Sequence, residues 1–372
     1  MRYERMPIEA ESPEETGYDT IRYNLAESSV HDRTLGEVLP DGTLNDLVLA
    51  YAHHRGKPEL CDLIVADSPG LTGRDVLVCT GAATALFIIA TTLLSAEDHL
   101  IVIRPNYSTN LETPRAIGCP TTIIDLSFEA GFQIDVAAIR QAIRPDTRLI
   151  SITNPHNPTG QLYTAETLDA LTELARQHNC HLLVDETYRD LNFQTPLQPY
   201  MAANAPHVIS VCSLSKAFGV PGIRMGWIVC RDAVLMTRFL AAKEQIVICN
   251  SILDEAIAEH LLRRKAELLP PVHAHIRQNY AIISDWFAAN ADLIRWNPPQ
   301  AGVVGFARIN PDLTIDTDAF YHTLYHQYQT MVGAGHWFEL PDAYMRIGFG
   351  YPTADELRQG LANIRACLLA CR

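Results

Sequence analysis

The sequence predicts an α/β fold that consists of a large domain with a mostly parallel central sheet and a smaller α+β domain. Short apolar runs alternate with helical patterns from residue 76 to 230, and the pattern becomes helical and polar-faced after residue 251. Isolated strand patterns and a closing helix follow. The 372 residues leave room for two domains of the usual size, which is about 150 residues.

Seven apolar runs, each short enough for one strand, predict the large domain. They occupy residues 76–79, 100–103, 121–125, 149–153, 181–184, 208–212 and 223–229. Strands that alternate with helices are joined by crossovers, which makes the sheet parallel and covers both of its faces. Between the fourth and fifth runs, Thr164 is placed to cap a helix whose apolar residues share one side, namely Leu168, Leu171, Leu174 and Ala175.

The smaller domain is predicted from the last third of the chain. Strand patterns occur at residues 303–309 and 344–349, and a closing helix begins at Ala354. The first forty residues have no strong periodicity of their own, so we expect them to pack on this smaller domain. The predicted limits are 45–250 for the large domain and 1–44 with 251–372 for the small one.

The charge balance excludes two classes of partner. Forty-three acidic and 29 basic residues give a formal charge of −14, so nucleic acid and anionic membrane surfaces would be repelled. The amino terminus, MRYERMPIEAESPEE, is polar and acidic, whereas a secretory signal needs an apolar run behind a basic start. We therefore expect a cytoplasmic protein that binds small molecules.

The cysteines, the histidine pairs and one apolar stretch have simple explanations. Nine cysteines lack paired CxxC spacing, which favours buried free thiols over disulfides or zinc. The pairs His53–His54 and His273/His275 have no surrounding ligand set, so no metal is assigned. Residues 76–96 carry no charge, but Thr80-Gly81 interrupts them, which predicts a strand and a buried helix rather than a membrane span.

Polar motifs follow four of the predicted strands, where ligands gather in open α/β sheets. They are Gly81-Ala82-Ala83, the loop NPHNPTG at 154–160, DETY at 185–188 and SLSK at 213–216. A small-residue turn that opens a helix presents N–H groups to a phosphate, although Gly81 fits a tight packing turn equally well. Each motif alone is therefore a weak signal.

Several of these residues have structural explanations as well as functional ones. Asp185 is suited to a helix cap or an ion pair, Arg224 to a surface charge, and Ser213 and Ser215 to a turn. Lys216 differs, because it follows a predicted buried strand and the two serines, where desolvation lowers the pKa of an amine. A buried amine of this kind is a candidate for Schiff-base formation.

Taken together, the motifs resemble one known family. NPHNPTG, DETY, SLSKAFGVPGIRMGW and YMRIGFG, in this order and spacing, resemble the class I and II aminotransferases. The resemblance extends from Tyr23 to the last helix. It implies the aspartate-aminotransferase-like fold type I, an enzyme, and the cofactor pyridoxal 5′-phosphate (PLP).

The resemblance also implies roles for the residues that would contact the cofactor ring. Lys216 would form the Schiff base with the cofactor aldehyde and move the substrate proton. Asp185 would pair with the pyridinium nitrogen, and Asn157 and Tyr188 would hydrogen-bond the phenolate oxygen. Tyr107 would stack on the ring, its alternative being a core tyrosine at a strand end.

The cofactor phosphate and the substrate have their own implied contacts. The backbone N–H groups of Ala82 and Ala83 would hold the phosphate, together with Ser213, Ser215 and Arg224. By the same resemblance, Arg346 would bind the carboxylate of an amino acid, and Asn157 would also contact the substrate. The family's site lies at a subunit interface, which implies a homodimer in which Tyr51 reaches the partner's phosphate. The Asn157–Pro158 bond is expected to be cis.

These roles predict transfer of an amino group between an L-amino acid and a 2-oxo acid. The alternative is β-elimination and cyclisation of a β-hydroxy amino acid. It rests on segments 26–38, 300–310 and 345–352, which resemble the capreomycidine-synthase branch that acts on a hydroxyarginine. Ser28, Ser29, Val30 and His31 are then expected to line the pocket, unless they belong to an ordinary amino-terminal arm.

Two further questions stay open at this level. Glu27, Asp32 and Glu112 are candidates to hold a guanidinium group, although most surface carboxylates are only solvated. A DNA-binding regulator with the same domain would need a basic amino-terminal helix-turn-helix of roughly 60 residues. The acidic segment before Tyr23 does not fit that class.

Overall fold

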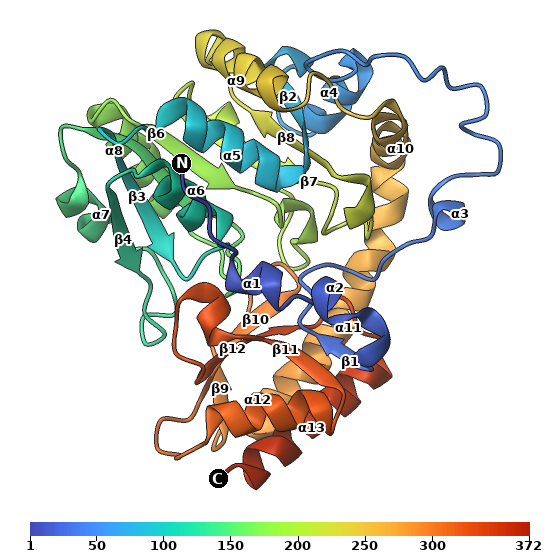
Figure 1. Ribbon diagram of the computed structural model, residues 1–372, viewed down its shortest axis with the longest axis vertical. Helices are drawn as coiled ribbons and strands as arrows, with labels where there is room; N and C mark the ends of the chain where they lie inside the picture. The colour runs from blue at the N-terminus through green and yellow to red at the C-terminus, as the bar shows by residue number, and fades with distance from the viewer.

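The computed structural model describes all residues from Met1 to Arg372 and contains two sheets, each in its own lobe (Figure 1). The upper lobe in Figure 1 holds the seven-stranded sheet, and the lower lobe holds the five-stranded sheet. The long helix α11 (Lys265–Ala289) runs beside both lobes. This arrangement confirms the predicted α/β fold with a second, smaller α+β unit.

The seven-stranded sheet has the order β2-β8-β7-β6-β5-β3-β4. Four neighbouring pairs are parallel, and only β8 runs antiparallel to both of its neighbours. The predicted strands are confirmed as β2 (Val76–Thr80), β3 (His99–Arg104), β4 (Thr121–Asp125), β5 (Thr147–Thr153), β6 (His181–Asp185), β7 (Val208–Ser213) and β8 (Met225–Val229). The last begins later than expected, because Pro221–Ile223 form a single helical turn and Arg224 is left-handed (φ 43°).

Helices cover this sheet. They are α4 (Pro58–Val65), α5 (Gly81–Leu93), α6 (Thr109–Ile117), α7 (Val136–Ala142), α8 (Ala165–Gln177), α9 (Ala233–Ile246) and α10 (Ile252–Arg263). Thr164 caps α8 as predicted, since its side chain accepts the N–H of Thr167. The uncharged stretch 76–96 forms β2 and α5, and the protein contains no helix with the length and apolarity that a bilayer crossing requires.

The five-stranded sheet has the order β1-β11-β12-β10-β9. Its strands are β1 (Tyr23–Leu25), β9 (Ile294–Trp296), β10 (Val304–Ile309), β11 (Thr330–Ala334) and β12 (Tyr344–Gly348), with helices α12 (Thr317–His326) and α13 (Ala354–Ala370). Strand β1 pairs in parallel with β11. Within the first forty residues, Tyr23–Leu25 therefore belong to the smaller sheet.

Short amino-terminal helices lie between the two lobes. These are α1 (Pro7–Ala10) and α2 (Pro13–Thr16), and α1 packs on the turn Gly335–Phe338 (Figure 1). After α3 (Leu35–Val38), residues 39–57 form an extended arm on the outside of the upper lobe. The amino-terminal segment thereby places side chains where the two sheets meet.

Candidate active site

A cavity of about 500 Å³ opens where the amino-terminal helices meet the carboxyl ends of the large sheet. Its size is typical of sites that hold small ligands. Most of the residues singled out in the sequence line it: Ala82, Ala83, Tyr107, Asn157, Asp185, Tyr188, Ser213, Ser215, Lys216, Arg224 and Arg346. The fold thus brings together side chains that are up to 264 positions apart, as Ala82 and Arg346 are.

Lys216 follows β7 and points its amine into this cavity. The Nζ atom donates a hydrogen bond to Ser28 Oγ over 3.1 Å, and the Lys216 carbonyl accepts the N–H of Val30. Desolvation lowers the pKa of the amine, while the nearby carboxylate of Glu27 opposes that shift. The amine therefore loses its proton more readily than a solvated lysine does.

One end of the cavity is suited to an anion. Helix α5 begins there without a side-chain cap, so the N–H groups of Ala82 and Ala83 in its first turn have no side-chain acceptor. The Arg224 guanidinium lies close by, because a Cβ on Gly81 would meet Arg224 Nη2 at 2.6 Å. Ser213 and Ser215 complete the group. A positive helix end, two hydroxyls and a guanidinium are groups that suit a phosphate.

Glycines permit this close approach. Gly81 has a φ of +82°, a backbone conformation that L side chains rarely adopt. In β8, a Cβ on Gly226 would lie 2.6 Å from the Ala82 nitrogen. A larger residue at either position would push the start of α5 out of place, so the structure favours the phosphate interpretation of Gly81 alongside the packing one.

Asp185 and Tyr188 lie at the end of β6 and in the turn after it. Asp185 is buried, and both of its hydrogen bonds, from Thr187 N and Thr187 Oγ1, go to the single oxygen Oδ1. Burial raises the pKa of this carboxyl group. Burial also raises the pKa of Tyr188 to about 12, so its phenol stays protonated, yet its Oη has no hydrogen-bond partner. Both groups have capacity left for a ligand.

Arg346, on β12, brings the small sheet into the site. Its Nη1 donates to Asn157 Oδ1 over 3.2 Å and its Nη2 to the Ala26 carbonyl over 2.8 Å. The Nε–H has no partner, although the residue is only 4% exposed. A buried unpaired donor of this kind costs free energy unless a ligand accepts its hydrogen bond. Desolvation lowers the pKa of the guanidinium, and a bound carboxylate would oppose that effect.

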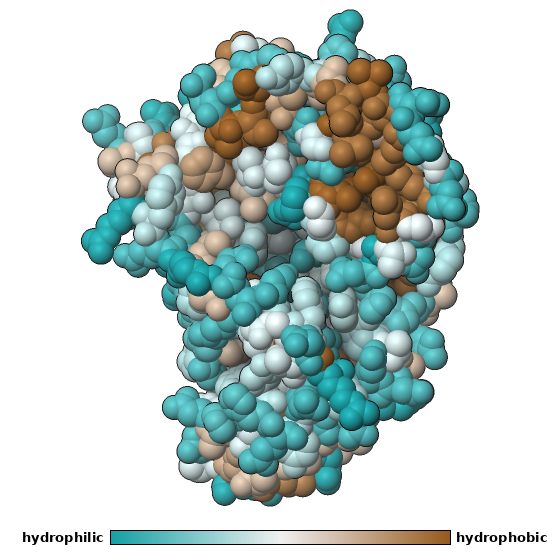
Figure 2. All heavy atoms as spheres, turned by 45° about the vertical axis from the view of Figure 1, so that its right-hand side comes forward, coloured by the Kyte–Doolittle hydropathy of each residue, from teal (hydrophilic) through white to brown (hydrophobic).

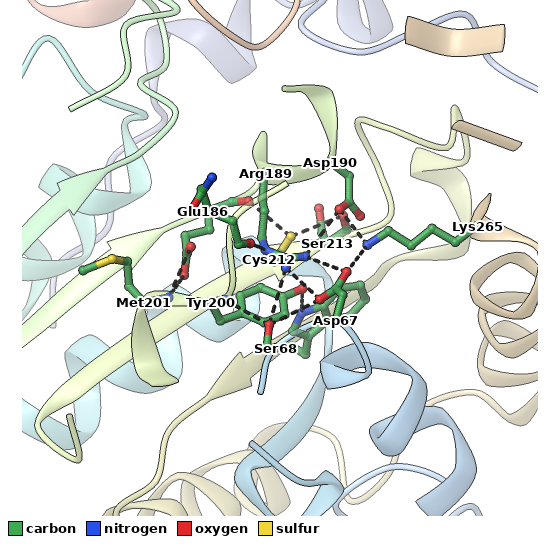
Figure 3. A network of polar contacts seen from close by, with 12 residues as sticks. Asp67, Ser68, Glu186, Arg189, Asp190, Tyr200, Met201, Cys212, Ser213 and Lys265 are labelled. Atoms are coloured by element: carbon green, nitrogen blue, oxygen red, sulfur yellow. Dashed lines mark hydrogen bonds and ion pairs between the residues drawn. The ribbon is translucent and has the colours of Figure 1, made fainter. Parts of the chain in front are cut away.

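A polar network surrounds the buried residues Arg189 and Asp190, which follow Asp185 and Tyr188 in the sequence (Figure 3). The Arg189 side chain, 3% exposed, pairs with Asp67 at 2.7 Å and lies 4.1 Å over the Tyr200 ring. Lys265 bridges Asp67 and Asp190 at 2.8 and 2.7 Å. Three segments, after α4, after β6 and at the start of α11, are thereby locked together. Sequence reasoning missed this network because no local spacing relates Asp67 to Arg189.

Two predicted substrate residues are not on the cavity wall. Ser29 and Val30 are buried behind it, whereas their neighbour Ser28 lines it. Val30 packs in the hydrophobic core, and its N–H is bonded to the Lys216 carbonyl. His31 is exposed and packs against the Tyr351 ring. The expectation that Ser29, Val30 and His31 line the pocket is therefore wrong for this cavity, and of the three only Val30 bonds to Lys216.

Other expectations have mixed outcomes. The Asn157–Pro158 bond is cis, as predicted. Tyr107 lines the cavity and donates a hydrogen bond from Oη to Glu9 Oε1 over 3.1 Å. Tyr51 is 84% exposed on the arm and takes no part in the cavity of its own chain. The sequence reasoning also missed Glu9, Glu14 and Tyr18, which belong to short elements without a motif.

The residues present fit PLP. The uncapped α5, Arg224 and the two serines suit its phosphate, and the free oxygen of Asp185 suits a pyridinium N–H. The unpartnered Tyr188 Oη is a donor for a phenolate oxygen. No lining residue contradicts this fit.

Comparison with known proteins agrees with this geometry. Residues 45–364 match the family model described as aminotransferase class I and II. The chain is 28% identical to capreomycidine synthase of Streptomyces vinaceus, over 93% of this chain and 90% of that one. It is 27% identical to an arginine–pyruvate transaminase of Pseudomonas aeruginosa, over 85% and 82%.

Comparison with solved structures agrees with the sequence comparisons. A PLP-dependent aminotransferase from Streptococcus suis superposes with a TM-score of 0.91 at 25% identity, covering 100% of this chain and 99% of that one. The PLP-dependent cyclase OrfR superposes with a TM-score of 0.89 at 26% identity, covering 100% and 98%. The chain therefore belongs to the class I and II aminotransferases, a family of PLP-dependent enzymes.

Proposed function

We propose that the protein transfers an amino group between an L-amino acid and a 2-oxo acid, with Lys216 as its catalytic residue. The proposal rests on one observation above all: a lysine with a lowered pKa lies in one cavity with the uncapped start of α5, Arg224 and a buried carboxylate. PLP, when bound, supplies an aldehyde that exchanges amino groups and a ring that withdraws electrons.

Residues of the chain bind the cofactor and the substrate and transfer the proton. Ala82, Ala83, Ser213, Ser215 and Arg224 bind and orient the phosphate. Asp185 keeps a proton on the ring nitrogen, and Tyr188 and Asn157 donate hydrogen bonds to the ring oxygen. Tyr107 packs against the ring face. Arg346 holds the substrate carboxylate, and the Lys216 amine removes the proton from the substrate Cα and returns one.

The homodimer predicted above is part of this proposal. Val48, Leu49 and Tyr51 on the arm are 73%, 73% and 84% exposed, more apolar surface than a free monomer usually presents in one short segment. Figure 2 shows hydrophobic side chains gathered on the upper lobe of this face. We propose that a second copy covers the arm and that Tyr51 contributes to the partner's phosphate site. The cytoplasmic location and the domain limits 45–250 and 1–44 with 251–372 stay predictions.

Elimination of a β-hydroxyl group followed by ring closure is the second candidate. It is supported by the similarity to capreomycidine synthase over 93% of this chain and to the cyclase OrfR. The phosphate and ring contacts are the same for both reactions, so they do not separate the two candidates.

Two measurements test the proposal. First, PLP-loaded protein is treated with borohydride and its peptides are mapped by mass. Lys216 should carry the cofactor, and Lys243, a buried lysine whose pKa is also lowered, should stay unmodified. A colourless protein, or cofactor on another lysine, contradicts the proposal. Second, incubation with amino acids and 2-oxo acids should yield a new amino acid, whereas a product lighter by one water would favour elimination.

A further inference from the structure

The amino-terminal segment gives the cavity an acidic wall. Glu9 on α1, Glu14 on α2 and Glu27 just after β1 all line it. All three carboxylates lie near enough to Lys216 to raise its pKa against the effect of burial. They therefore face the place where the substrate reacts, rather than the bulk solvent alone.

The cations of the cavity are already assigned. Lys216, Arg224 and Arg346 are the only lysine or arginine residues among those that line it. The proposed function uses them for the cofactor aldehyde, the phosphate and the substrate carboxylate. No fourth cation of this chain is left for a carboxylate at the end of a substrate side chain, and three glutamates would repel one.

The three glutamates are not neutralised by ion pairs within the chain. Glu27 Oε1 accepts a hydrogen bond from Tyr18 Oη over 3.1 Å, and Glu9 Oε1 accepts one from Tyr107 Oη over 3.1 Å. By contrast Glu15, next to Glu14 on α2, pairs with Arg5 at 3.1 Å outside the cavity. Burial raises the pKa of Glu27, and the nearby charges of Lys216 and Arg346 oppose this shift without forming an ion pair with it.

A second observation is that two buried polar groups of this cavity have no hydrogen-bond partner within the chain. Arg346 Nε and Tyr188 Oη line it without partners, and their residues are only 4% and 2% exposed. Glu27 and Arg346 also influence each other's pKa, so the acidic wall and the carboxylate-binding donor lie within electrostatic reach. The site thus offers a cation for one end of its substrate and anions for the other.

We infer that the substrate is an L-amino acid whose side chain ends in a cation, a guanidinium or an ammonium group, with Glu27 as its main partner and Glu9 and Glu14 beside it. This inference rests on the proposed function, since it takes the α-carboxylate to lie at Arg346. A fixed carboxylate pairs with a cation through charge-assisted hydrogen bonds. Aspartate and glutamate are disfavoured as substrates, because their side-chain carboxylates would face Glu27.

The test compares matched amino acids on PLP-loaded protein. L-Arginine, L-ornithine, L-citrulline and L-glutamate are titrated separately, and the change in absorbance of the bound cofactor gives each dissociation constant. L-Citrulline has nearly the shape of L-arginine but no charge. L-Arginine or L-ornithine should bind at least about tenfold more tightly than L-citrulline, and the better of the two identifies the cationic group.

Substitutions of single glutamates test whether the acidic wall determines the preference for a cationic side chain. Glu27→Gln should reduce the preference for the cation over L-citrulline about tenfold or more, with cofactor binding unchanged. Glu15→Gln, on the same face of the molecule but outside the cavity, should leave the preference unchanged. If Glu27→Gln does not fold, Glu14→Gln, which alters a more exposed position, should still reduce the preference.

The results that would overturn this inference differ from those that would overturn the proposed function. Equal binding of L-citrulline or tighter binding of L-glutamate overturns the inference and leaves the proposed function intact. A preference that is unchanged in both Glu27→Gln and Glu14→Gln also overturns it. Failure of PLP to attach to Lys216 overturns the proposed function itself.

Discussion

Asp185 and Glu186 are adjacent acids with opposite surroundings. Successive side chains of an extended segment point to opposite sides, so Asp185 lines the cavity while Glu186 lies behind it and accepts the N–H of Met201. Both are buried at 4% exposure. Asp185 has a free oxygen for a ligand, whereas the burial of Glu186 only destabilises the charged form of its carboxyl group.

The burial of the Glu186 carboxyl group predicts that the stability of the protein depends on pH. Burial raises the pKa of Glu186 from 4.5 to about 7, so the native state keeps this proton to a higher pH than the unfolded state does. Its contribution to the free energy of unfolding is complete below pH 4.5 and is lost as the pH rises to about 7. The expected loss is about 3 kcal/mol.

Glu186→Gln isolates this contribution, because the amide oxygen still accepts a hydrogen bond but cannot ionise. Urea unfolding of both proteins at pH 5 and pH 8 should show the variant gaining about 3 kcal/mol relative to the wild type at the higher pH. An equal difference at both pH values would mean that Glu186 titrates normally.

At the residue scale, the sequence predicts side chains that follow strands and fails for those of the amino-terminal segment. Lys216, Asp185 and Arg224 occur in motifs whose order alone indicates a cavity. Glu9 and Glu14 lie on helices of four residues each, where no periodicity can be recognised. Their place in the cavity depends on long-range packing that no local pattern encodes.

At the scale of elements, the network of Arg189 joins the turn after β6 to the segment after α4 and to the start of α11. The Arg189 side chain is buried, and its ion pair with Asp67 and its bond from Nε to the Gln198 carbonyl are partly buried. A buried pair contributes little net stability when complete, but removal of one partner leaves a charge uncompensated.

Arg189→Met is therefore expected to lower the free energy of unfolding by about 3 kcal/mol or more, with Lys265 compensating for part of the lost charge. Arg176→Met is the matched control, because Arg176 forms an exposed pair with Glu173 on α8. The control should leave the urea midpoint nearly unchanged, because an exposed ion pair contributes little to stability. Similar urea midpoints for both variants would show that the network is not important for stability.

The strands illustrate why prediction succeeds for some elements only. The inner strands of the large sheet are apolar runs that are largely buried on both faces, as in β7 with six buried residues, whereas the edge strand β4 has no buried residue. Strands β1 and β9 have three residues each, and β11 contains Thr330 and Gly333. Such strands exist because they pair with β12, β10 or each other in the small sheet, so the sequence alone did not indicate them.

At the scale of the whole molecule, most residues in the arm 39–57 are exposed to solvent. Its end is held to the upper lobe by His54, which bonds Glu244 on α9, and by Lys57, which bonds Glu255 on α10. The apolar residues Ile246, Ile248 and Leu253 are exposed on and between the same helices. The arm and these helices thus present apolar surface in one region of the molecule.

The proposed homodimer predicts a specific response to charge in this region. Leu49→Asp would bury an unpaired carboxylate in the interface, which opposes association strongly. Sedimentation velocity should show a dimer for the wild type and a monomer for the variant, with weaker PLP retention because Tyr51 no longer reaches the partner's site. Leu369→Asp, at a 41% exposed position on α13, should stay dimeric. A monomeric wild type, or a Leu49→Asp dimer with normal cofactor retention, would contradict both the interface and the role of Tyr51.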